Sequence, residues 1–316
     1  MIISASYKTD IPAFYSAWFL RRLAAGQCRM VNPWNAKPIT VPLDSASIDG
    51  FVLWTRNIAP LSAHLGTVAA HAPFMVQYTI TGYPRALEAG TVPAARAIAE
   101  MHTLRQRFGP RAAVWRYDPI LFTSLTGGDW HRRNFTRLAK ALRGTTDEVV
   151  ISFAQIYRKT RRNLEAAALR HGFTWHDPDA AEKKTLVAAL AARAAEHGMA
   201  LRLCAQAEFV VPGAAPARCV DAARLSDLAG RPIAAAVKGN RPDCLCHTAR
   251  DIGAYDSCPQ GCVYCYAVQT RDRAKQQNRA HDPAGDFLSA PARPDTGAAG
   301  QAVVSTRSTP SGGASG

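Results

Sequence analysis

Five of the eight cysteines crowd into the short stretch between residues 244 and 265. They are Cys244, Cys246, Cys258, Cys262 and Cys265. Thiolates at such close spacing are ligands for zinc and for iron–sulfur clusters. Because the opening MIISASYKTD lacks the pattern of a secretion signal, the crowding indicates a metal centre rather than disulfides. Of the other three, we expect Cys28 and Cys204 to be buried small apolar residues, while the role of Cys219 stays open.

The C-x3-C-x2-C spacing of Cys258, Cys262 and Cys265 is typical of a loop that holds a [4Fe-4S] cluster. One tight loop can present three thiolates to three corners of the cubane, which leaves the fourth iron without a ligand from that loop. This iron can coordinate the amino and carboxylate groups of S-adenosyl-L-methionine. We expect the ring of Tyr264, directly before the third cysteine, to lie near the adenine of that cofactor.

The two upstream cysteines leave other arrangements open. Cys244 or Cys246 could fold back and supply the fourth ligand, which would give a closed cluster that transfers electrons or stabilises the fold. Alternatively, Cys244, Cys246 or His247 could join two of the downstream thiolates in a zinc site. The sequence does not decide between one metal centre and two.

Short apolar runs alternate with amphipathic stretches along the chain, which is the pattern of β/α units. The predicted strands are 2–6, 51–54, 74–78, 112–115, 149–153 and 201–204. The predicted helices are 11–25, 93–108, 129–142, 156–170 and 180–197. The order predicts an α/β fold with a parallel sheet, as a complete or partial β/α barrel of the TIM type or as a doubly wound sheet.

Polar side chains gather where each predicted strand ends, and this favours the barrel. Lys8, Arg56 and Arg116 lie at three strand exits, and Asp118 follows Arg116 closely. In a β/α barrel all these exits face one mouth, where the chemistry is done. We therefore predict that Lys8, Arg56 and Asp118 position an unknown substrate there. The simpler alternative is that strand ends are polar because loops contact water.

Composition limits the partners. The 316 residues carry a net charge of +14, with 30 Arg and 8 Lys. Such a surface attracts nucleic acid or other anions, yet the arginines are scattered along several helices rather than gathered in one block. A nucleic-acid partner therefore stays open. No stretch is apolar enough to span a membrane, so we expect a cytoplasmic protein.

The composition changes near His281, after which Gly, Ala, Pro, Ser and Thr dominate without apolar periodicity. Such a segment buries too little apolar surface to offset the entropy of ordering it. We therefore predict a barrel domain over residues 1–280, which includes the cysteine segment 244–267, and a disordered tail over residues 281–316.

The segment CPQGCVYCYA, from Cys258 to Ala267, resembles the cluster loop of radical-SAM enzymes, especially the branch of spore photoproduct lyase and DNA repair photolyase. Residues 1 to about 267 also resemble an uncharacterised bacterial family, through ISASYKTD, DGFVLWTRN, RYDP and DIGAYDSCPQGCVYCYA. That family has no settled activity. The resemblance implies an iron–sulfur cluster, a barrel and an electron donor, and it leaves a DNA-repair role as an alternative.

In radical-SAM enzymes the cluster loop follows the first strand, whereas here it comes last. The resemblance therefore implies a circularly permuted barrel, in which the first strand lies beside the strand before the cysteine loop. Thr9 and Asp10, at the exit of the first strand, would then lie where those enzymes contact the amino group of S-adenosyl-L-methionine.

Overall fold

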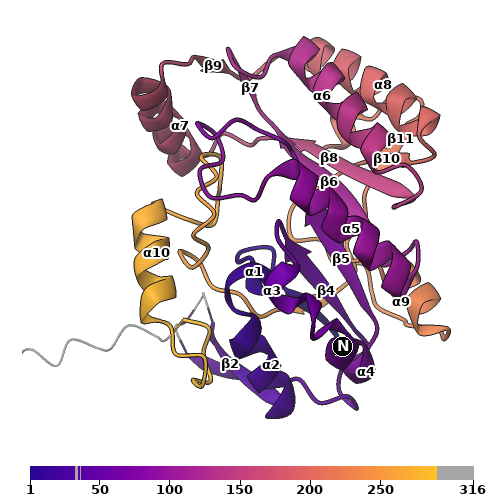
Figure 1. The fold of residues 1–316 in the computed structure, drawn as a ribbon, viewed down its shortest axis with the longest axis vertical. Coiled ribbons are helices and arrows are strands. Elements are labelled where there is room, and N and C mark those ends of the chain that lie inside the picture. The colour runs from indigo at the N-terminus through magenta and orange to yellow at the C-terminus, as the bar shows by residue number, and fades with distance from the viewer. Residues whose placement is uncertain (33–34, 36, 290–316) are drawn as a thin grey trace, which may run out of the picture.

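The computed structural model describes residues 1–32, 35 and 37–289, which are built around one eight-stranded parallel sheet (Figure 1). Across the sheet the order is β11 (Ala214–Pro216), β10 (Ala200–Leu203), β8 (Glu148–Phe153), β6 (Ala113–Ile120), β5 (Phe74–Thr79), β4 (Gly50–Thr55), β1 (Ile2–Ala5) and β12 (Ala249–Asp251). The α/β class, the parallel sheet and all six predicted strands are confirmed. The short edge strands β11 and β12 were not predicted, because three residues leave no readable periodicity.

The strands are apolar on both faces, as expected for a covered parallel sheet. Alternate residues such as Ile3, Leu53 and Val76 pack on one face, which we call the outer face, against the helices. Residues of the opposite parity, such as Val52 and Met75, lie on the inner face. There the segment 217–246 covers them through Ala217, Cys219, Val220, Leu225 and Cys246.

Helices of the outer face connect successive strands. They are α1 (Ile11–Phe14), α2 (Ser16–Ala24), α3 (Ala59–Ser62), α4 (Leu65–His71), α5 (Ala94–Phe108), α6 (Gly128–Ala141) and α8 (Ala180–Glu196). Helix α7 (Arg158–His171) packs apart from them, in a small cluster with Leu121, Phe173 and Tyr264. The predicted helix over 11–25 is interrupted at Tyr15, so that Asp10 caps only the first turn, by accepting a hydrogen bond from the backbone N–H of Ala13. The four other predicted helices are confirmed with shifts of one or two residues.

The remaining elements lie outside the main sheet. The strands β2 (Gln27–Val31) and β3 (Pro38–Pro42) form an antiparallel pair, and so do the two-residue strands β7 (Phe122–Thr123) and β9 (Trp175–His176). Helix α9 (Ala222–Ala229) packs on the inner face, the 3-10 turn η1 (Ala207–Phe209) follows β10, and α10 (Arg271–Ala280) follows the cysteine loop. Among the described residues, no helix has both the length and the apolar character that crossing a membrane requires.

Closure into a barrel, which the sequence led us to expect, is not seen in the described part of the chain. The sheet ends at β11 on one side and at β12 on the other, and each edge strand has only three residues. The segment 217–246, which joins these edges, lies on the inner face instead of adding strands between them. The expected sequential strand order is nevertheless present from β1 to β11.

The start of the predicted tail is held against the fold. Trp18 Nε1 donates to the carbonyl oxygen of Gly285 at 3.0 Å, and Arg22 Nη1 lies 2.5 Å from Asp286 Oδ1. Leu288 is buried in the main core. Residues 281–289 are therefore packed on α2. The composition of the segment does not reveal this, because the contacts come from Trp18 and Arg22, far away in the sequence. The rest of the predicted tail, 290–316, lies outside the described residues.

Candidate functional site

The cysteine loop leaves the sheet beside the first strand. β12 pairs with β1 in parallel, with Ile2, Ile3 and Ser4 opposite residues 249, 250 and 251. Neighbouring parallel strands end at the same edge of a sheet, so the loops that follow them begin there. The predicted proximity of the first strand and the strand before the cysteines is thereby confirmed. The loops that follow β1 and β12 meet at this carboxyl edge.

Asp251 at the end of β12 ties these two loops together. Its carboxylate accepts hydrogen bonds from Ser4 Oγ and Ser6 Oγ, both at 2.8 Å, and from the backbone N–H of Tyr7 at 3.1 Å. Lys8 Nζ lies 3.2 Å from the same carboxylate. Lys8, which we predicted at the mouth, is therefore at the expected edge with its charge paired by Asp251.

Glycine allows this close contact. A Cβ atom on Gly253 would lie 2.0 Å from Ser6 Oγ and 2.6 Å from Ser6 Cβ, so a larger residue would push the two loops apart. Within the cysteine loop, Gly261 has a φ of +77° and so occupies the left-handed region that favours glycine. This turn lets Cys258 and Cys262 lie in one short loop.

Thr9 and Asp10 also hold the cysteine loop. Thr9 Oγ1 donates to the carbonyl oxygen of Ala254 at 2.8 Å. Asp10 Oδ2 accepts from Gln260 Nε2 and from the backbone N–H of Arg56, both at 2.9 Å. Burial raises the pKa of the Asp10 carboxyl, although these hydrogen bonds lower it in part. Both residues lie next to the loop, and their predicted contact with S-adenosyl-L-methionine stays a prediction.

The three thiols of the loop are free and half-buried. Burial raises the pKa of the Cys262 thiol to about 12, while the nearby Arg56 guanidinium lowers it in part. Burial likewise raises the pKa of the Cys258 and Cys265 thiols, and Cys258 lies within electrostatic range of Cys265. Neutral thiols are thus favoured in the protein alone, and a bound cation would be needed to stabilise three thiolates together.

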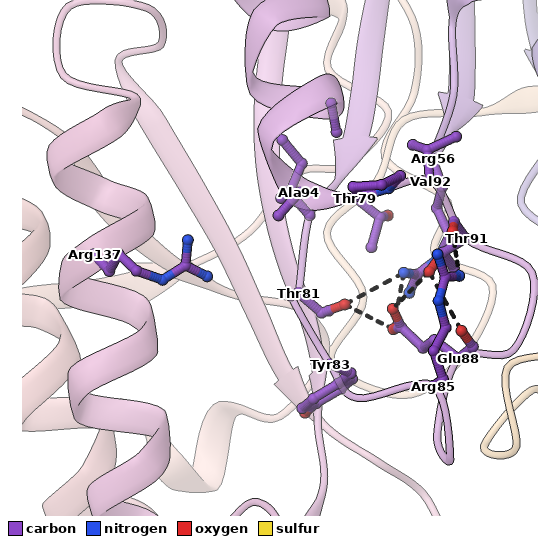
Figure 2. A pocket seen from close by; sticks show the side chains of 14 residues that line it. Arg56, Thr79, Thr81, Tyr83, Arg85, Glu88, Thr91, Val92, Ala94 and Arg137 are labelled. Atoms are coloured by element: carbon purple, nitrogen blue, oxygen red, sulfur yellow. Dashed lines mark hydrogen bonds and ion pairs between the residues drawn. The ribbon is translucent and has the colours of Figure 1, made fainter.

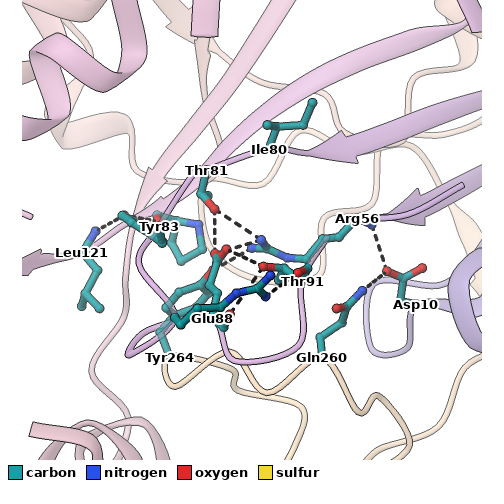
Figure 3. Close-up of polar contacts among 12 residues, drawn as sticks. Asp10, Arg56, Ile80, Thr81, Tyr83, Glu88, Thr91, Leu121, Gln260 and Tyr264 are labelled. Atoms are coloured by element: carbon teal, nitrogen blue, oxygen red, sulfur yellow. Dashed lines mark hydrogen bonds and ion pairs between the residues drawn. The ribbon is translucent and has the colours of Figure 1, made fainter. Parts of the chain in front are cut away.

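Arg56, at the exit of β4, joins the cysteine loop to the neighbouring strand exit. Figure 3 shows Arg56 between Asp10 on one side and Glu88, Thr81 and Tyr264 on the other. Its Nη1 donates to Glu88 Oε1 at 2.8 Å, and its Nη2 donates to Tyr264 OH at 2.6 Å. Glu88 also accepts from Thr81 Oγ1 at 2.7 Å and from Tyr264 OH. The side chain of Tyr264 is thereby fixed by a buried ion pair.

A cavity of about 260 Å³ opens beside this network. Its wall includes Arg56, Thr81, Tyr83 and Glu88 from the exits of β4 and β5, and Arg137 from α6 (Figure 2). Figure 2 shows the Arg56–Glu88 pair on one side and Arg137 on the other. Ile80, Val92 and Ala97 also line it, so the cavity has both polar and apolar walls, with guanidinium groups on two sides.

A second polar layer crosses the inner face of the sheet. Arg116 on β6 donates to Asp118 Oδ2 at 2.5 Å and to Gln77 Oε1 at 3.2 Å, and its guanidinium lies over the ring of Trp54. Asp118 also accepts a hydrogen bond from Ser152 Oγ on β8. The predicted mouth residue Asp118 thus lies among strand exits, where Arg116 pairs its charge.

The two upstream cysteines lie with two others rather than in the 258–265 loop. Cys219 Sγ is 3.5 Å from Cys204 Sγ, and hydrogen bonding links Cys219 to Cys246 and Cys246 to Cys244. The hydrogen bond with Cys219, and then burial, raise the pKa of the Cys204 thiol. Within the described residues, no set of three or more His, Cys, Asp and Glu side chains is arranged to hold a metal ion.

Several of these residues carry no signal that local sequence reasoning could use. Glu88 lies in a loop of 14 residues between β5 and α5, and Cys204 and Cys219 stand apart from the crowded cysteines. Asp251 ends a strand of only three residues, and the polar residues His247, Thr248 and Arg250 before it give no apolar run that would mark this strand.

Comparison with known proteins gives one match. The family model described as "Domain of unknown function (DUF1848)" matches residues 2–267. No curated protein and no solved structure matches the chain. The match ends at Ala267, the last residue of the segment that contains the three loop cysteines.

Proposed function

The chain belongs to the DUF1848 family, a family of unknown function, and we propose that it is an iron–sulfur protein of the radical-SAM type. In this proposal Cys258, Cys262 and Cys265 hold a [4Fe-4S] cluster at the carboxyl edge of a partial, circularly permuted β/α barrel. The observation that carries the proposal is the parallel pairing of β12 with β1. It puts the cysteine loop beside the strand exits that would surround a cofactor.

The donor set fits a cubane better than a single ion. Each thiolate of a cubane binds its own iron, so the three sulfurs need not converge on one position. The Arg56 guanidinium lies within electrostatic range of Cys262 and offsets part of the negative charge that thiolate ligands bring. Cys244 and Cys246 lie with Cys204 and Cys219, which favours an open fourth position over a closed cluster.

The loop also carries a buried acceptor that lacks a partner. Gln260, between Cys258 and Cys262, uses its amide nitrogen on Asp10, but its Oε1 atom is buried and has no hydrogen-bond partner among the described residues. An unsatisfied buried acceptor costs about 1–3 kcal/mol. A bound molecule with an N–H donor would remove this cost, and the amino group of S-adenosyl-L-methionine is such a donor.

The bound cluster would supply an electron to S-adenosyl-L-methionine, which is how radical-SAM enzymes cleave the sulfonium carbon–sulfur bond. The residues of the chain would prepare the surroundings. Arg56 and Glu88 fix Tyr264, and the cavity beside them would take the substrate. Lys8 and Asp118 are paired with Asp251 and Arg116 and would act as fixed dipoles rather than free charges.

The first test is electron paramagnetic resonance of the anaerobic, dithionite-reduced protein, with and without S-adenosyl-L-methionine. We expect a [4Fe-4S] signal that changes when S-adenosyl-L-methionine is added, because the fourth iron is open. A cluster signal that does not change when S-adenosyl-L-methionine is added would refute the open site and indicate a closed cluster.

Iron content tests the ligand assignment separately. We expect Cys262→Ala to lose its iron, whereas Cys28→Ala, a matched change at a buried cysteine of β2, keeps it. Equal iron content in the two variants would show that the 258–265 loop does not hold the cluster.

A further inference from the structure

Cys204 and Cys219 form a close pair that the cluster proposal does not use. Cys204 directly follows β10, and Cys219 lies between β11 and α9 on the inner face of the sheet. Their Sγ atoms are 3.5 Å apart, and both thiols are free. A disulfide bond is about 2.0 Å long, so the sulfurs must approach each other by roughly 1.5 Å to form one.

Each sulfur also receives a hydrogen bond from a guanidinium group. Arg116 Nη1 lies 3.0 Å from Cys219 Sγ, and Arg241 Nη2 lies 3.4 Å from Cys204 Sγ. Arg116 lowers the pKa of both thiols in part, but hydrogen bonding among the cysteines and burial raise the pKa of both overall, so the thiolate that attacks a disulfide is a minor form. Cys204 is half-buried, whereas Cys219 is only 1% exposed. An incoming reagent therefore reaches Cys204 first, and Cys219 stands behind it as the second thiol.

We propose that Cys204 and Cys219 are a redox-active pair, which closes to a disulfide by exchange with a low-molecular-weight disulfide. Cys204 attacks one sulfur of the small disulfide, forms a mixed disulfide and expels one small thiolate. Cys219 then attacks the Cys204 sulfur and expels the second thiolate. The protons of the two cysteines go to the two small thiolates, so the protein loses two electrons and the small disulfide gains them.

The pair lies where its oxidation would affect the proposed mouth. Arg116 divides its hydrogen bonds between Cys219, Gln77 and Asp118. Closing the disulfide pulls Cys219 towards Cys204 and weakens the contact with Arg116. None of these residues belongs to the 258–265 loop, so the inference stands or falls independently of the cluster.

The test is a redox titration of the full, unaltered chain. The protein is equilibrated anaerobically in mixtures of reduced and oxidised glutathione, its free thiols are alkylated, and its peptides are mapped by mass spectrometry. We expect a Cys204–Cys219 disulfide to appear in one two-electron transition, with the loss of two alkylatable thiols. Absence of this disulfide in fully oxidised buffer would overturn the proposal.

Two variants separate a redox pair from a merely structural contact. Cys219→Ser removes the second thiol, so glutathione should stay attached to Cys204 as a mixed disulfide. Cys28→Ser, at a buried cysteine outside the pair, should show the unchanged transition. If Cys204 instead pairs with Cys244 or Cys246, or if a bound metal protects all four thiols from oxidation, the assignment of the pair is wrong.

Discussion

Replacing Glu88 with Gln removes one charge from the buried network beside the cysteine loop. Glu88 is 2% exposed and Arg56 12% exposed in their side chains, and the two lie 2.8 Å apart. Glutamine keeps the shape but leaves the Arg56 guanidinium buried without its counter-charge. Breaking a buried pair from one side costs about 3–5 kcal/mol, because the remaining ion is desolvated and uncompensated.

The assay is urea-induced unfolding at pH 7, which measures the free energy of unfolding of each variant. Glu196→Gln provides the matched control, since Glu196 pairs with Arg193 at the surface with both side chains about half exposed. That change should cost about 0–1 kcal/mol. The double variant Arg56→Met with Glu88→Leu removes both charges, and we expect it to be more stable than Glu88→Gln alone.

Two results would refute this reasoning. If Glu88→Gln loses no more stability than Glu196→Gln, the carboxylate does not compensate Arg56. If the double variant is less stable than Glu88→Gln, the loss comes from packing and hydrogen bonds rather than from an unpaired charge.

Three further outcomes follow from contacts described by the structure. Burial lowers the pKa of His131 to about 4, from an unfolded value near 6.5. Between these pH values the unfolded state binds a proton that the folded state does not, so the free energy of unfolding should fall by about 3 kcal/mol as the pH is lowered from 6.5 to 4. His131→Gln should remove this slope, and an unchanged slope would exclude His131 as its source. Gly253→Ala should reduce the free energy of unfolding by about 1–3 kcal/mol and so lower the melting temperature, because the added Cβ would clash with Ser6. An unchanged melting temperature would mean that the two loops can separate freely. Arg22→Ala should speed proteolysis after residue 280, because it removes the ion pair with Asp286, and equal cleavage rates would show that this pair does not hold the segment.

The sequence predicts well those features that depend on local pattern. The six long strands are readable because each is a short apolar run between polar loops. The position of the 258–265 loop beside the first strand was also predictable, since it followed from comparing the order of the cysteines with that of known cluster proteins. The cluster, S-adenosyl-L-methionine and a nucleic-acid partner stay predictions.

The features that sequence reasoning missed depend on tertiary contacts that no local pattern marks. Glu88 meets Tyr264 across 176 positions, and Cys204 meets Cys219 only because β10 and the 217–246 segment share the inner face. Barrel closure is not shown by the described residues, and the segment that covers the inner face has no periodic pattern that would reveal its position.

The pairing of β1 with β12 has a consequence for how the chain is made. Ser4 and Asp251 are 247 positions apart, although their side chains are in direct contact. Because β12 follows all the other described strands in the chain, the edge of β1 towards β12 stays unpaired during synthesis until residues 249–251 have emerged from the ribosome. Of the described strands, β12 leads into the proposed cofactor site, and the same strand covers the edge of β1, which would be prone to aggregation if it stayed unpaired.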